Sequence, residues 1–274
     1  MAVFLRPSIS TFASSTASYI RPISFSSSFL KFPKMDSHSN LSIASSLSLS
    51  SSSSVDEKKN PNRKLPILLF DVMDTLVRDP FYHDIPAFFS MTFQELIDCK
   101  HPTAWVDFEK GLINEVELAK VFFKDGRSFD LDGLKNCMKS GFSYLDGVEA
   151  LLSNLKQNSY EIHAFTNYPV WYNMIEDKLK LSNYLSWTFC SCAIGKRKPE
   201  ADSYLEVLRQ LEVEQPDNCI FIDDRMVNVE AAKNAGIIGI QFKGAVALQE
   251  ELSQLGVETI ASLNGQNMNP VLEP

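Results

Sequence analysis

The stretch PILLFDVMDTLV, residues 66–77, joins an apolar run to a short acidic segment that begins at Asp71. An apolar run of this length, followed at once by polar residues, is typical of a strand buried on both faces of a parallel sheet. Four further apolar runs follow, with helical spacing between them: EIHAF (161–165), TFCSCAI (188–194), CIFI (219–222) and IIGIQF (237–242). This alternation predicts an α/β fold, a doubly wound parallel sheet with helices on both faces.

The segment between the first two predicted strands is much longer than a crossover helix needs. It holds two helix-start patterns, Thr92 with Glu95 and Asn114 with Glu117, and no strong strand pattern. We therefore expect a helical cap at residues 78–142, inserted between the core segments 56–77 and 143–264. Residues 265–274 are expected to form a C-terminal tail.

Two helices of the predicted core have signals of their own. Asp146 with Glu149 matches a capping box in front of an apolar helix. A second helix is predicted from four apolar residues at helical spacing, Tyr204, Leu205, Leu208 and Leu211.

The first 55 residues differ in composition from the rest of the chain. They contain 20 serines and four basic residues, but Asp36 is the only acid among them. This composition is typical of an organelle transit peptide, and the dominance of serine over arginine favours the chloroplast over the mitochondrion. We therefore expect a disordered, Ser-rich leader that directs the protein to the chloroplast stroma.

The net charge of the chain indicates which classes of partner it is expected to bind. The whole chain has a net charge of −8, and the remainder is more acidic still once the basic leader is set aside. An acidic protein is not expected to bind nucleic acid or anionic membranes through its bulk charge. The sequence also lacks an apolar run approaching the roughly 20 residues that span a bilayer, so we expect neither a nucleic-acid nor a membrane partner.

Polar residues lie at or just beyond the ends of four predicted strands. They are Asp71 to Thr75, Thr166 with Asn167, Lys198, and Asp223 with Asp224. Parallel strands bring such residues to one rim of the sheet. A carboxylate nucleophile, a hydroxyl donor, a fixed cation and further carboxylates that bind a divalent metal suit in-line displacement at phosphorus.

Each of these motifs has a simpler interpretation when it is taken alone. Asp71 or Thr166 would serve as a helix cap. Lys198 belongs to the short basic run KRK and would be a solvated charge, and Asp223 with Asp224 would form an acidic turn. Their shared order and position at strand ends favour the catalytic interpretation.

The four motifs resemble those of the haloacid dehalogenase-like (HAD) hydrolase superfamily, over a region from about Leu65 to Leu263. In this superfamily a helical cap is inserted after the first motif. The resemblance implies that Asp71 is the nucleophile, that Thr166 hydrogen-bonds the transferring phosphoryl group, and that Lys198 neutralises negative charge on both.

The same resemblance implies a Mg²⁺ cofactor. Its expected ligands are Asp71, the backbone carbonyl of Met73, Asp223 and Asp224. Phosphatases of the superfamily carry a general acid and base two residues after the nucleophile, where this chain has Met73. A methionine side chain cannot donate a proton. Asp74 is not expected to replace the missing acid, since adjacent residues on an extended strand point to opposite faces.

This departure leaves three functions open. The first is a Mg²⁺-dependent phosphomonoester hydrolase that acts through an aspartyl-phosphate. The second is a weakly active or non-catalytic protein that binds a phosphorylated ligand, and the third is a haloacid-type dehalogenase, which uses the same nucleophile without the second aspartate.

The expected substrate comes from a narrower resemblance. The segment FDVMDTLVRDPFYHDIPAFF and the Ser-rich leader are similar to plant chloroplast enzymes of this superfamily that hydrolyse flavin mononucleotide (FMN). This implies FMN as the phosphate ester, with Tyr82, Asn167 and Tyr168 in substrate binding. His83 is considered as an alternative proton donor, and Arg78 either as a phosphate contact or as a residue that holds the cap linker.

Overall fold

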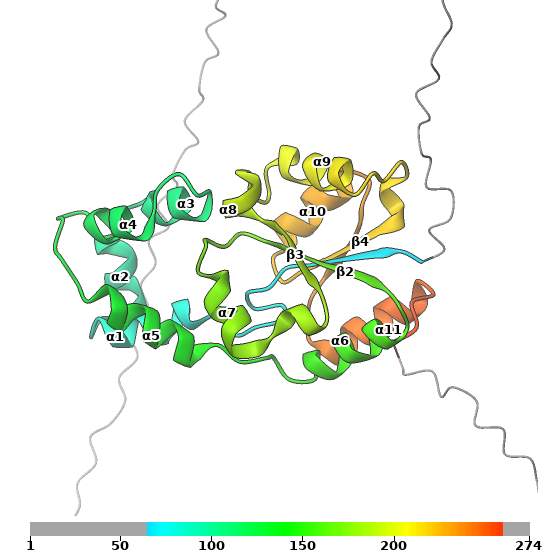
Figure 1. Ribbon diagram of the computed structural model, residues 1–274, viewed down its shortest axis with the longest axis horizontal. Helices are drawn as coiled ribbons and strands as arrows, with labels where there is room; N and C mark the ends of the chain where they lie inside the picture. Colours follow the sequence, from blue (N-terminus) through cyan, green and yellow to red (C-terminus); the bar gives the residue numbers. More distant parts are fainter. Residues whose placement is uncertain (1–64, 260–274) are drawn as a thin grey trace, which may run out of the picture. The chain divides into compact units, whose positions relative to one another are not determined.

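Five parallel strands form one sheet in the part of the chain that the structure, a computed structural model, describes, namely residues 65–259 (Figure 1). The predicted leader (1–55) and C-terminal tail (265–274) lie outside the described residues. The spatial order is β3-β2-β1-β4-β5. The strands are β1 (Ile67–Phe70), β2 (Glu161–Thr166), β3 (Ser186–Cys190), β4 (Cys219–Asp223) and β5 (Ile238–Gln241).

The first strand, β1, lies at the centre of the sheet, and it is buried as predicted. All four of its residues are buried, and Phe70 is in register with Ala164 on β2 and with Ile222 on β4. The backbone N–H of Asp71 continues the ladder by donating to the carbonyl of Ile222 at 2.9 Å. Asp71 is thereby fixed at the carboxyl edge of the sheet, between its two neighbouring strands.

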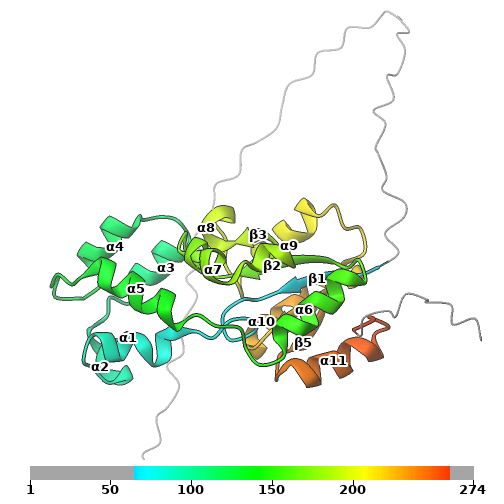
Figure 2. The same cartoon turned by 60° about the horizontal axis from the view of Figure 1, so that its bottom comes forward.

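Helices cover both faces of the sheet, which confirms the predicted doubly wound α/β fold (Figures 1 and 2). One face carries α6 (Val148–Gln157), α7 (Tyr172–Leu179) and α11 (Ala245–Gln254), and the other carries α9 (Ala201–Gln210) and α10 (Met226–Asn234). The predicted stripe on α9 is correct at Tyr204, Leu208 and Leu211, which are buried, but Leu205 is exposed.

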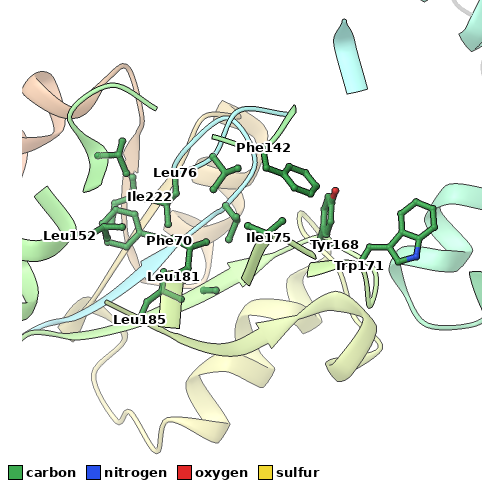
Figure 3. Close-up of a cluster of buried hydrophobic side chains, with 14 of the residues drawn as sticks. Phe70, Leu76, Phe142, Leu152, Tyr168, Trp171, Ile175, Leu181, Leu185 and Ile222 are labelled. Atoms are coloured by element: carbon green, nitrogen blue, oxygen red, sulfur yellow. The ribbon is translucent and has the colours of Figure 1, made fainter. Parts of the chain in front are cut away.

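The larger apolar core runs from the sheet toward the cap. Figure 3 shows Phe70 and Ile222 of the sheet near Leu152 of α6, with the cluster continuing through Ile175 to Trp171. Trp171 lies at the edge of this cluster, and its indole N–H donates to the Glu115 carboxylate at 2.8 Å. Packing and a hydrogen bond therefore join the core to the first residue of the cap helix α4 (Glu115–Val121).

The insertion after β1 is helical, and its helices gather to one side of the layers of the sheet (Figure 2). Two of its helix starts are confirmed as capping boxes, because Thr92 and Glu95 cap each other's backbone N–H groups, and Asn114 and Glu117 do the same. Besides α4, the insertion contains η1 (Pro80–Tyr82), α1 (Asp84–Phe88), α2 (Phe93–Cys99), α3 (Ala104–Glu109) and α5 (Leu131–Gly141).

Arg78 holds together the two segments that connect core and cap. Its guanidinium pairs with Asp84 at 2.7 Å and donates to the carbonyl of Gly141 at 3.0 Å. Its backbone N–H donates to the carbonyl of Ser143 at 2.9 Å. Of the two roles considered for Arg78, the structure shows the linker contact.

Two local predictions were wrong. Helix α6 is not capped by Asp146 and Glu149, since its N-cap is Gly147 with φ 75° and no side-chain cap. The strand predicted at 188–194 ends early, and 191–194 form the helical turn α8 (Ser191–Ile194). Strand β2 supplies no partner beyond the Thr166–Cys190 pair, so the ladder stops there.

Two short turns complete the described part. Two short 3-10 turns, η2 (Leu181–Asn183) and η3 (Pro216–Asn218), connect helices to strands. Within residues 65–259 no helix combines the length and apolar character needed to cross a bilayer.

Candidate active site

One ammonium group holds two carboxylates together at the carboxyl edge of the sheet. The Nζ of Lys198 lies 2.8 Å from Oδ1 of Asp71 and 2.6 Å from Oδ2 of Asp223. Lys198 and Asp223 are almost completely buried, and Asp71 keeps a relative exposure of 7%. A charge cluster this deep is stable only because its members are paired.

The pKa values of this cluster follow from burial and from its neighbours. Burial raises the pKa of Asp71 to about 7, and the nearby Asp223 carboxylate adds to the rise while Lys198 opposes it. Burial alone would lower the pKa of Lys198, but the carboxylates of Asp71 and Asp223 raise it above its ordinary value. Lys198 is therefore a permanent cation at physiological pH.

Asp223 is held from several sides. Its Oδ1 accepts the backbone N–H of Arg225 at 2.8 Å, and the side-chain amide of Asn228 donates to both carboxylate oxygens at 3.0 Å. These donors come from the turn after β4 and from the start of α10. The sequence predicted Asp223 at a strand end, and the structure adds that this carboxylate is fully ordered by its neighbours.

Thr166 points a buried hydroxyl into the site. Within the part of the chain that the structure describes, its Oγ1 has no hydrogen-bond partner. It does not cap the next helix, since α7 begins at Tyr172 with Trp171 as its N-cap. A buried donor without a partner costs free energy unless a ligand uses it.

Asn167 joins the second motif to the third. Its side-chain oxygen accepts the backbone N–H of Lys198 at 2.8 Å, and its side-chain nitrogen donates to the backbone carbonyl of Lys198, also at 2.8 Å. Although Asn167 was predicted to bind substrate, the contacts that the structure gives it position Lys198. Its place in the lining of the cavity described below leaves the substrate contact as a prediction.

The residues at this edge fit a divalent metal ion. Ligand oxygens of Asp71, Asp223 and Asp224 lie within 4.8 Å of one another. No described residue donates a hydrogen bond to the Asp224 carboxylate. The backbone N–H of Asp224 donates to the hydroxyl of Thr75 at 3.1 Å. Three convergent carboxylates match the oxygen ligands that Mg²⁺ prefers.

A cavity of about 250 Å³ opens above these groups, between the core and the cap. The core side of its lining includes Asp71, Thr166, Asn167, Lys198 and Asp224. The cap side includes the aromatic residues Phe81, Tyr82 and Trp105 and the charged residues Lys100 and Glu109. The cavity therefore combines an acid-and-cation floor with an aromatic wall.

The sequence pattern of the haloacid dehalogenase-like hydrolases matches residues 67–236. The chain belongs to this family. It is 63% identical over 206 residues to the chloroplast flavin mononucleotide hydrolase 1 of Arabidopsis thaliana, an alignment that covers 75% of this chain and 83% of the relative. It is 26% identical to the sesquiterpene phosphatase AstK of Aspergillus oryzae, over 55% of this chain and 78% of that protein.

Solved structures share the fold. The magnesium complex of a HAD family enzyme from Bacteroides thetaiotaomicron superposes with a TM-score of 0.56 and 21% identity, over 71% of this chain and 99% of that one. The complex of the same enzyme with magnesium and inorganic phosphate gives a TM-score of 0.54 at 21% identity, over 66% and 96%.

The first motif of this HAD-like hydrolase departs from an extended strand after Asp71. Asp74 lies in the left-handed region, with φ 54°, and its Oδ1 accepts the backbone N–H of Asp79 at 3.0 Å. The expectation that Asp74 points away on an extended strand was therefore wrong in its geometry, since the turn places both Met73 and Asp74 in the cavity lining. The Met73 carbonyl stays a predicted metal ligand.

The structure places the tyrosines predicted to bind substrate at the cavity. Tyr82 and Tyr168 both line the cavity, and the hydroxyl of Tyr168 is buried without a partner among the described residues. Trp105 of α3 also lines the cavity. His83 is exposed and does not line it, which argues against His83 as the proton donor.

Sequence reasoning missed a charged pair that spans the cavity wall. Arg197 donates to Glu109 of α3 at 2.9 Å, and both residues line the cavity. Arg197 was hidden in the basic run KRK, beside Lys198. Glu109 and another missed residue, Asp79, carry no local signal, because only the folding of the cap brings them to the site.

Proposed function

We propose that this chain is a Mg²⁺-dependent phosphatase that hydrolyses FMN to riboflavin and inorganic phosphate. The observation that carries the proposal is the Asp71 carboxylate, held by Lys198 at 2.8 Å on the floor of a cavity that Thr166 also lines. The 63% identity to the Arabidopsis flavin mononucleotide hydrolase supports FMN as the substrate.

In this proposal Asp71 attacks phosphorus. Lys198 holds Oδ1 of Asp71 in place, so that Oδ2 is the oxygen that forms the bond to phosphorus. The attack produces an aspartyl-phosphate and expels riboflavin. Water then cleaves this intermediate, which releases phosphate and restores the carboxylate.

Two fixed donors stabilise the phosphoryl group as it transfers. The Thr166 hydroxyl donates to one of its oxygens, and the Lys198 ammonium offsets the negative charge of nucleophile and phosphate. Asn167 keeps Lys198 in position through its two backbone hydrogen bonds. Mg²⁺ bound to Asp71, Asp223 and Asp224 would supply further positive charge, which favours the ionised form of Asp71.

The cap side of the cavity suits a flat ring system. Phe81, Tyr82 and Trp105 offer apolar faces that would pack on the isoalloxazine. The Tyr168 hydroxyl and the buried Nε of Arg197, which has no partner among the described residues, are donors for the polar edge of the ring.

We also propose that residues 1–55 direct the protein to the chloroplast stroma. The support is their composition and the chloroplast location in the name of the Arabidopsis relative. A fusion of residues 1–55 to a fluorescent protein should accumulate in the stroma of plant cells, whereas a diffuse cytosolic signal would contradict the assignment.

The test of the activity uses the full-length chain and FMN. Riboflavin and phosphate should appear in equal amounts, stop on addition of EDTA and return with Mg²⁺. Asp71→Asn should abolish turnover, while Asp202→Asn, an exposed aspartate on α9, should leave it unchanged. Binding of FMN without turnover would favour the non-catalytic alternative, and metal-independent halide release from 2-chloropropionate would favour a dehalogenase.

A further inference from the structure

The proposed reaction needs a proton that the first motif does not supply. The leaving group from FMN is an alkoxide, which departs slowly unless an acid protonates its oxygen. Met73 has no proton to give. Five carboxyl groups line the cavity, those of Asp71, Asp74, Asp79, Glu109 and Asp224.

Three of these carboxyl groups have other tasks. Asp71 is the proposed nucleophile, and Asp224 is a proposed metal ligand. Burial raises the pKa of Glu109, but Arg197 opposes the rise and donates to it at 2.9 Å, so this carboxylate is engaged in an ion pair. Asp74 and Asp79 remain.

Position separates Asp79 from Asp74, because Asp79 begins the cap as the N-cap of η1, whereas Asp74 lies in the turn after β1, beside the predicted metal ligand Met73. Asp79 is the N-cap of η1, where its Oδ1 accepts the backbone N–H of Phe81 at 2.9 Å. Its own backbone N–H donates to Oδ1 of Asp74 at 3.0 Å, so Asp74 serves as a support for Asp79. The Oδ2 of Asp79 accepts no hydrogen bond from any residue in the described range, which leaves this oxygen for the ligand.

We propose that Asp79 is the general acid that protonates the leaving oxygen of FMN, and the general base that then activates water. This inference rests on the proposed function. As the Asp71–phosphorus bond forms and the ester P–O bond breaks, the carboxyl proton of Asp79 passes to the ribityl oxygen. The resulting carboxylate removes a proton from the water that cleaves the aspartyl-phosphate, which restores both aspartates.

The surroundings of Asp79 raise its pKa toward neutrality, so that part of the population carries the proton near neutral pH. Burial raises its pKa to about 6, the Phe81 N–H opposes the rise, and the carboxylates of Asp74, Glu109 and Asp224 add to it. Tyr82 and Tyr168 also face it, and their own pKa values are raised, so neither hydroxyl ionises in this range. A catalytic acid works best when its pKa lies near the working pH.

The test compares leaving groups in Asp79→Asn. Asparagine keeps the oxygen that caps η1 but cannot give up a carboxyl proton. With FMN, rapid-mixing measurements should show riboflavin release slowed by about 10²–10⁴-fold. With p-nitrophenyl phosphate, whose leaving group needs no proton, the first equivalent of nitrophenolate should appear at nearly the wild-type rate, and only later turnovers should be slow.

The matched control is Asp130→Asn. Asp130 is also an N-cap, since it accepts the Gly133 N–H at 2.9 Å at the start of α5, but it does not line the cavity. This variant should retain wild-type rates with both substrates. Circular dichroism of all variants checks that the fold is retained.

The outcomes distinguish the two proposals. If wild-type protein does not hydrolyse FMN, the proposed function fails. If it does, but Asp79→Asn releases the first riboflavin within about 3-fold of the wild-type rate, the acid role of Asp79 is overturned. Equal slowing of the first release from both substrates would overturn it as well, because a positioning effect does not depend on the leaving group.

Discussion

The two walls of the cavity differ in how their side chains are held. On the core wall, the ammonium group of Lys198 is fixed by the carboxylate of Asp71 and by that of Asp223, which is buried beneath the lining. On the cap wall, Tyr82 is half exposed and contacts mainly the aromatic rings of Phe81 and Phe93. The charged groups of the core wall are held by the sheet and its loops, whereas the groups that we propose to select the substrate lie on short elements of the cap.

The largest effect should come from breaking the core wall at Lys198. Lys198→Met leaves Asp71 and Asp223 buried without their cation, which should abolish turnover and cost about 3–5 kcal/mol of unfolding free energy. Urea denaturation and FMN hydrolysis measure the two losses. The neighbouring variant Lys196→Met removes only a partly exposed pair with Glu206 and should cost no more than about 1 kcal/mol. Similar losses for both variants would contradict the comparison.

A smaller effect is expected from the cap wall. Tyr82→Ala removes an aromatic face from the cavity, so KM for FMN should rise by up to about 10-fold, in line with the roughly 0.5–1.5 kcal/mol of an aromatic contact. Hydrolysis of p-nitrophenyl phosphate, which reaches the core wall without filling the cap side, should change little. If kcat falls to the same degree with both substrates, Tyr82 acts on the chemical step, and the proposed difference between the core wall and the cap wall is wrong.

Tyr168 lies where the two walls meet, and Tyr168→Phe should have a milder consequence still. The buried hydroxyl has no partner among the described residues, so its loss should not reduce stability. If FMN uses this donor, its KM should rise by about 3–10-fold. Thermal melts without ligand and steady-state kinetics with FMN test both statements, and an unchanged KM would remove Tyr168 from substrate binding.

A last effect concerns the pH dependence of stability at Asp79, between core and cap. Its folded-state pKa of about 6 lies above the ordinary 3.8, so the folded state binds this proton more tightly than the unfolded state. Stability from this group is therefore present below about pH 4 and is lost as the pH rises to about 6. Asp79→Asn lacks this dependence. Between these pH values, the free energy of unfolding of the variant should therefore rise relative to that of wild type, as measured by denaturation. A constant difference would mean that the Asp79 carboxyl is not perturbed.

The sheet and its catalytic edge could be predicted because both depend on local sequence. Buried parallel strands are short apolar runs, and the polar residues that follow them, such as Asp71 and Asp223, must meet at one edge. The capping boxes at Thr92 and Asn114 are also local. Asp146 has the same pattern, but Gly147 reaches a positive φ more easily and takes the N-cap position.

The cap wall could not be predicted in the same way. Glu109 and Asp79 reach the cavity through the packing of short helices, whose relative orientation no periodicity encodes. Their neighbours in sequence gave no reason to separate them from surface acids. Asp74 shows a related limit, because its left-handed turn places it by a backbone conformation that residue spacing does not reveal.

The paired hydrogen bonds between Asn167 and Lys198 have a consequence for protein engineering. The side-chain amide of Asn167 hydrogen-bonds both the backbone N–H and the backbone carbonyl of Lys198. The conformations of the loop after β2 and of the loop before α9 therefore depend on each other. A chimera that exchanged only one of these loops with a distant relative would misplace the ammonium group even if every catalytic residue were retained. Loop grafts intended to change the substrate should therefore transfer both loops together, or leave both in place and vary only the cap.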